Sequence, residues 1–144
     1  MKYYTATEVV KILPYIKSYI RDIKRNYKAV DILNKRFDKL NQIATMDKDK
    51  FEKIQSLKTK IIERVQFTAE RYIRWKNELR EINCYVCTAK YGRIDVPIFD
   101  PMTEEFIFIC VGEETTHKNL KYHEIYDQNY RNAKPFYTED NVTN

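Results

Sequence analysis

Glycine is scarce in this sequence, with 2 residues in 144. Loops that cradle phosphates or dinucleotides need several glycines, because their backbone must come close to the ligand. The sequence also shows no Ser, His and Asp arrangement of the kind that nucleophilic hydrolases use. These absences disfavour nucleotide-driven enzymes, and the sequence as a whole favours a protein that is not an enzyme.

Long apolar runs are absent as well. No segment approaches the roughly 18 consecutive apolar residues of a membrane-spanning helix, and the N-terminus lacks the layout of a signal peptide. The three cysteines, Cys84, Cys87 and Cys110, are an odd number in a chain without an export signal. We therefore expect a cytoplasmic protein with reduced thiols rather than a disulfide framework.

The composition is typical of a folded protein, with 33% charged and 43% hydrophobic residues in a length that suits one domain. The formal net charge of +5 is unevenly distributed. Residues 1–80 carry 20 Lys and Arg against 10 Asp and Glu, whereas residues 81–144 carry 6 against 11. This asymmetry indicates either an anionic partner for the basic half or attraction between the halves, within one molecule or across a dimer.

The basic half has the pattern of a helical hairpin over about residues 5–82. Thr5 and Glu8 form a capping box, which predicts the start of the first helix. Pro14 lies inside the apolar pattern and predicts a kink or a short break. Beyond it, one apolar position recurs every seven residues, at Ile16, Ile23, Val30, Phe37 and Ala44.

Residues 44–49 carry no apolar period and predict the turn of the hairpin, with Asp49 as the cap of the second helix. From Phe51 to Ile82 the apolar residues follow helical spacings, which predicts a second long amphipathic helix. Because the connection is short, we expect the two helices to be antiparallel neighbours.

After Ile82 the pattern changes to that of a small β unit over about residues 84–126. Pro97 predicts that its strand lies at a sheet edge, and residues 138–144 read as a polar tail. The fold class expected is α+β, mostly α, with a long antiparallel helical hairpin followed by an antiparallel β unit in one domain, 1–144. The segments with β character are Cys84–Thr88, Ile94–Ile98 and Glu105–Val111, with a short strand or turn at residues 120–126.

Four sequence blocks occur in an order that resembles a known family. They are YYTATEVVKILP with Thr5, Glu8, Leu13 and Pro14, then GRIDVP from Gly92, then FIFICVGEE with Cys110, Gly112 and Glu113, then YHEI from Tyr122. In these blocks the chain resembles the uncharacterised prokaryotic family catalogued as domain of unknown function 2203, although it has Val111 and Tyr122 where that family usually shows Trp. The resemblance implies a two-helix plus β architecture and implies no activity, because the family has none assigned.

Four residues in these blocks have side chains suited to acid–base or metal chemistry: Asp95, Glu113, His123 and Glu124. If the strands bring them together, they form a site for a divalent metal with a bound water, and the protein is a metal-dependent enzyme or metal-binding protein. The alternative, which we favour, is structural. In that interpretation Asp95 and His123 satisfy backbone groups at a turn, while the glutamates face solvent.

The cysteines suggest a weaker alternative, a zinc site made by Cys84, Cys87 and Cys110 with His117 or His123. Residues three apart in a strand point to opposite faces, so the Cys84-x-x-Cys87 pair needs a turn, and no glycine is present there. We favour the interpretation that the cysteines act as small hydrophobic residues. No cofactor is therefore favoured, with zinc or another divalent metal as the alternative.

The first helix carries a row of cations at helical spacing, and the interpretation that we favour is a solvated face in which neighbouring aspartates pair with the cations. The alternative is a basic face that tracks the phosphates of a nucleic acid. The residues are Lys17, Arg21, Lys24, Lys28, Lys35 and Lys39.

The apolar stripe of the hairpin is wider than two helices alone can bury. Part of it is expected to pack on the β unit and part on a second chain, most simply as a homodimer with a four-helix bundle. The function that this favours is a dimeric interaction or scaffold module. Nucleic-acid binding by the basic face and metal-dependent chemistry remain the alternatives, and a further protein partner is compatible with each.

Overall fold

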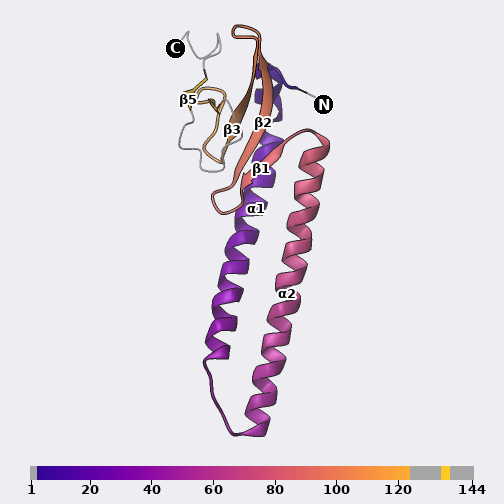
Figure 1. The fold of residues 1–144 in the computed structure, drawn as a ribbon, viewed down its shortest axis with the longest axis vertical. Helices are drawn as coiled ribbons and strands as arrows, with labels where there is room; N and C mark the ends of the chain where they lie inside the picture. Colours follow the sequence, from indigo (N-terminus) through magenta and orange to yellow (C-terminus); the bar gives the residue numbers. More distant parts are fainter. Residues whose placement is uncertain (1–2, 124–133, 137–144) are drawn as a thin grey trace.

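The structure, a computed structural model, describes residues 3–123 and 134–136. Two long helices, α1 (Ala6–Asn41) and α2 (Lys48–Glu81), form an antiparallel hairpin. A five-stranded sheet follows, and Figure 1 shows it beside one end of the hairpin, while the other end projects away. The predicted fold class, α+β and mostly α, is confirmed.

The sheet is antiparallel throughout, and its strands lie in the order of the sequence, β1-β2-β3-β4-β5. β2 and β3 form the long hairpin that the sequence predicts, with Pro97 opposite Phe108. The strands are β1 (Tyr85–Thr88), β2 (Arg93–Asp100), β3 (Glu105–Val111), β4 (Lys121–His123) and β5 (Lys134–Pro135).

The helix ends agree with local capping rules, with two differences from the sequence-based expectation. The Thr5 hydroxyl accepts from the Glu8 amide and the Glu8 carboxylate accepts from the Thr5 amide, so the capping box is confirmed. The second helix is capped by Asp47, not Asp49, because the Asp47 carboxylate reaches two first-turn amides at 2.9 and 3.2 Å. The short break predicted at Pro14 is absent, since α1 is continuous there.

Pro97 lies in an inner strand, so the predicted sheet edge is wrong for β2 as a whole. The reason is that β1 is short and its pairing ends at the Tyr85–Asp95 pair, before Pro97 is reached. The missing amide of Pro97 therefore leaves no β1 hydrogen bond unmade. On that side the Pro97 carbonyl accepts from the Tyr4 amide at 3.0 Å instead.

The hydrophobic core lies between the sheet and the adjoining end of the hairpin. Beyond this core, the hairpin continues as an arm, which we define as residues 32–68, where only Leu33 and Ile54 are buried. No helix in the described part of the chain is long and apolar enough to span a bilayer. Among the buried core residues are Val9, Leu13, Ile16, Ile20, Ile23, Leu79, Ile94, Val96, Ile98, Ile109 and Leu120.

Candidate anion-binding cleft

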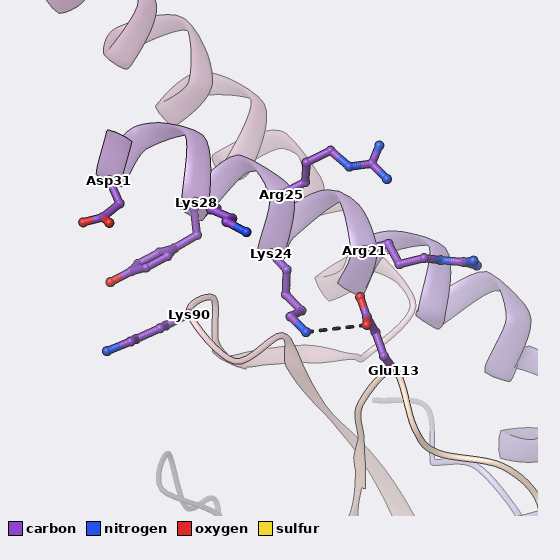
Figure 2. Close-up of a pocket in the computed structure, with 8 residues that line it drawn as sticks. Arg21, Lys24, Arg25, Lys28, Asp31, Lys90 and Glu113 are labelled. Carbon is purple, nitrogen blue, oxygen red and sulfur yellow. Dashed lines mark ion pairs between the residues drawn. The ribbon is translucent and has the colours of Figure 1, made fainter. Parts of the chain in front are cut away.

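A cleft of about 470 Å³ lies where the middle of α1 meets the turn between β1 and β2. Figure 2 shows side chains of α1 on one side of it, Lys90 from the β1–β2 turn opposite, and Glu113 from the residues after β3. Tyr27 and Asp31 complete the lining. The cations that line this cleft are Arg21, Lys24, Arg25, Lys28 and Lys90.

Helical spacing explains the α1 side of the cleft. Residues three or four positions apart lie on one side of a helix, so Arg21, Lys24, Arg25 and Lys28 fall along neighbouring rows. Ile20 and Ile23, which are buried in the core, fix the rotation of α1 and so direct these cations away from the sheet interior.

Gly92 explains how the β1–β2 turn comes so close to α1. It is buried and has φ +63°, a left-handed conformation that glycine adopts without strain. A Cβ atom at this position would lie 2.4 Å from Cγ and Cδ of Lys24 and 2.8 Å from Cγ2 of Ile20. Glycine is therefore needed both for the backbone conformation and for the close approach that places Lys90 at the cleft.

The positive charge of the cleft is only partly compensated. Lys24 Nζ lies 3.5 Å from Glu113 Oε2, the ion pair drawn in Figure 2. Asp31 Oδ2 is 3.0 Å from Lys35, which lies outside the cleft lining. Within the described part of the chain, no ion pair is formed by the other four cations of the cleft, Arg21, Arg25, Lys28 and Lys90.

Two exposed aromatic rings lie beside these cations. Tyr27 lines the cleft, and Tyr91 follows Lys90 in the β1–β2 turn. Lys90 Nζ is 5.4 Å from the centre of the Tyr91 ring, within the range of a cation–π interaction. Exposed rings next to cations are the combination on which unpaired bases stack while their phosphates are neutralised.

The structure separates the six cations of the predicted basic face. Arg21, Lys24 and Lys28 line the cleft. Lys17 instead donates to the Thr115 carbonyl at 2.8 Å, so it holds the segment after β3 against α1. Lys35 pairs with Asp31, and Lys39 lies on the arm at a different cavity.

Sequence reasoning missed two cations of the cleft, Arg25 and Lys90. The i,i+4 relation between Arg21 and Arg25 was a usable signal. Lys90 had no such signal, because it joins α1 only through the tertiary packing of the β1–β2 turn.

Asp95 and His123 lie inside the sheet, not at the cleft. Their side chains are 0% and 3% exposed, and His123 Nε2 is 2.9 Å from Asp95 Oδ1. The pair joins β2 to β4 across β3, and the His123 ring stacks on Phe108 with centroids 5.6 Å apart. At this burial a substrate does not reach either group, and the geometry fits a structural cross-link between side chains rather than a satisfied turn.

The predicted acid–base set is thus divided by the fold. Glu113 is engaged at the cleft by Lys24. Asp95 and His123 are together in the sheet. Glu124 lies outside the described residues.

None of the three cysteines forms a disulfide in the described structure, and all three are buried. Burial and, to a smaller extent, the neighbouring Asp95 carboxylate raise the pKa of the Cys110 thiol to about 12, so this thiol is protonated at neutral pH. Over residues 3–123 and 134–136, no group of three or more His, Cys, Asp and Glu side chains is placed to hold a metal ion. The candidate zinc ligands Cys84, Cys87, Cys110 and His123 are therefore not assembled as a metal centre there.

The arm carries a second cavity, of about 380 Å³, between the two helices. We call it the arm groove. Its apolar residues are Leu33, Leu40, Ile43, Leu57 and Ile61, and its polar residues are Arg36, Lys39, Lys60 and Arg64.

No family model matches the chain, and comparison with curated proteins and with solved structures gives no match either. The resemblance to domain of unknown function 2203 remains a prediction from the sequence blocks.

Proposed function

We propose that this protein binds single-stranded nucleic acid in the cleft between α1 and the β1–β2 turn. The observation that carries the proposal is that five cations from two separate elements line one cleft, four of them without an ion pair among the described residues. Cations held together at this density repel one another, and an anionic ligand relieves the repulsion.

The shape of the site favours a single strand over a duplex. Double-stranded DNA is stiff, and a cleft of about 470 Å³ is too small to admit it. A flexible single strand bends into such a cleft, neutralises its phosphates on the cations and stacks bases on Tyr27 and Tyr91. Stacking on a ring is tolerant of base identity, so we expect little sequence preference.

The test is fluorescence anisotropy with a labelled oligothymidylate of about 15 nucleotides, within the range of known single-strand site sizes. The double substitution Arg25→Gln and Lys28→Gln is expected to weaken binding strongly and to reduce its salt dependence, because two phosphate contacts are lost. Lys50→Gln with Lys53→Gln is the matched control, since it removes two exposed cations of α2 that lie outside the cleft lining. Equal weakening by the control and the double variant, or tighter binding of a duplex of the same sequence, would refute the proposal.

A second function, a homodimeric interaction module, is favoured by a separate observation. The arm exposes large apolar side chains, among them Ile43 at 45% and Leu57 at 42%, far from the core that seals the other end of the hairpin. Such a surface is typical of an interface with another chain. A four-helix bundle with the arms in full register would bring basic surface against basic surface, so the charges favour a different arrangement of the two copies. Sedimentation equilibrium at micromolar concentration tests the dimer, and a monomer would contradict it.

A further inference from the structure

The arm groove combines an apolar floor with a basic rim. Residues 32–68 carry nine Lys and Arg against five Asp and Glu, and the described residues that line the groove include four cations and no acid. The apolar floor requires an occupant with apolar side chains, and the rim requires that its charges be negative. Both requirements together describe an acidic, partly aromatic partner.

The opposite end of the same molecule has this chemistry. We define the β2–β3 tip as residues 99–106, which contain three acids and no base. Its apolar side chains protrude, with Met102 90% and Phe106 52% exposed. Phe106 packs on Phe99 and Tyr3 at centroid distances of 5.1 and 4.2 Å, so the rings form one small cluster.

The shape of the β2–β3 tip is fixed before any contact with a partner. Asp100 Oδ1 accepts from the Met102 amide at 3.0 Å, and Asp100 Oδ2 accepts from the Thr103 hydroxyl at 3.2 Å. Glu104 has φ +56°, a left-handed conformation that is uncommon for a residue with a side chain. A preformed turn loses little conformational freedom on docking, which favours binding.

We propose that the β2–β3 tip of one copy docks into the arm groove of a second copy, and that the second copy's tip docks reciprocally into the first. This deepens the homodimer function proposed above and rests on it. The acids Asp100, Glu104 and Glu105 meet the basic rim, while the Phe99 and Phe106 rings and Met102 meet the apolar floor.

The length of the molecule makes the contact intermolecular. Figure 1 shows the tip, drawn in orange, above the start of α1, and the arm at the opposite end of the molecule. Residues 6–38 of α1 span about 50 Å at 1.5 Å per residue, and this continuous helix keeps tip and groove of one chain apart. In an antiparallel pair related by a two-fold axis, each tip lies at the other copy's groove, so both contacts form and the assembly closes as a dimer.

Charge reversal tests this arrangement. The tip variant is Glu104→Lys with Glu105→Lys, and the groove variant is Lys60→Glu with Arg64→Glu. Each variant alone places like charges at both contacts, so its dimer dissociation constant, measured by sedimentation equilibrium, is expected to rise by about tenfold or more. When the two variants are mixed, reversed tip meets reversed groove and native tip meets native groove, so a heterodimer of parental affinity is expected.

The matched control is Lys50→Glu with Lys53→Glu, which reverses two exposed charges of α2 outside the groove lining and is expected to leave the dimer intact. Restored dimerisation in the mixture shows that both charge-reversed chains are folded. A dimer that neither variant weakens, or a mixture that does not recover, would overturn the tip-to-groove contact and leave the homodimer function standing. A parental protein that is monomeric at micromolar concentration would overturn both.

Discussion

Replacing Glu113 by Gln is expected to strengthen nucleic-acid binding. Glu113 is the carboxylate that occupies Lys24 in the cleft, with 3.5 Å between Oε2 and Nζ. Both side chains of this pair are partly exposed, at 39% for Lys24 and 44% for Glu113, so a bound phosphate has access to the lysine. Gln keeps the size of the side chain and removes its charge, which frees Lys24 for the ligand.

The expected gain in affinity and its salt dependence follow from the charges of the cleft. Four cations that form no ion pair with any described residue predict a slope of about −3 in a plot of log affinity against log salt, because each neutralised phosphate of a single strand contributes about −0.7. A fifth contact makes the slope about −3.5. An exposed ion pair is worth about 0.5–1 kcal/mol, so release of Lys24 from Glu113 is expected to tighten binding about two- to fivefold near 0.1 M salt.

The assay is fluorescence anisotropy with the labelled oligothymidylate, for parent and Glu113→Gln side by side. The steeper slope makes the advantage of the variant about two- to threefold larger at 50 mM than at 200 mM salt. Asp38→Asn removes the same charge near the far end of α1, outside the cleft lining, and is expected to leave the slope unchanged. Weaker binding by Glu113→Gln, or a gain that does not depend on salt, would refute the role assigned to the cleft.

Gly92→Ala is expected to lower the free energy of unfolding by about 1–3 kcal/mol, because its Cβ collides with Lys24 at a left-handed backbone position. Urea denaturation measures this, with the exposed Ser56→Ala as a control, and an unchanged midpoint would contradict the close approach. Asp95→Ala is expected to cost about 1–3 kcal/mol by leaving buried His123 without its carboxylate partner, with oligonucleotide affinity unchanged in protein that remains folded. Loss of binding without loss of stability would instead make the pair part of the functional site. Cys110, with its pKa raised to about 12, is expected to react with a maleimide at pH 8 at least about a hundredfold more slowly in the folded than in the urea-unfolded protein, as mass spectrometry of the labelled peptide shows. The raised pKa also means that the contribution of this thiol to stability is complete below about pH 8.5 and is lost as the pH rises towards 12.

The helical hairpin was predictable because its signals are local. The capping box at Thr5 and the apolar period of α1 and α2 are read within a few turns of one helix. The predicted cap of α2 was wrong by two residues, because a local signal of this kind occurs twice in succession. Asp47 and Asp49 both fit a cap, and only the position of the backbone amides decides between them.

The cleft was predictable on one side only. Helical spacing indicated Arg21, Lys24 and Lys28, since these lie along one row of α1. The other side depends on the left-handed turn at Gly92, which carries Lys90 to the helix, and on the segment after β3, which carries Glu113. The sequence pattern of β1 and β2 does not indicate which helix the turn between them will contact.

Predicting that Asp95 is the partner of His123 required knowledge of the strand order of the sheet. Asp95 and His123 are 28 positions apart and meet because β2 and β4 flank β3. The sequence blocks contained both residues, and their chemistry was compatible with catalysis or with a cross-link. Burial favours the cross-link, because a carboxylate and an imidazole that solvent does not reach are poorly placed to exchange protons with a substrate.

The two proposed functions are compatible because they use different sets of cations, those of the cleft and those of the arm groove. In the tip-to-groove dimer, the acids of each β2–β3 tip neutralise the rim of the partner's groove, so the arm is no longer an uncompensated basic surface. The cleft cations Arg21, Arg25, Lys28 and Lys90 lie outside the arm groove and remain available. Dimerisation therefore concentrates the free positive charge at two clefts instead of spreading it along two arms, and it directs an anionic strand to them.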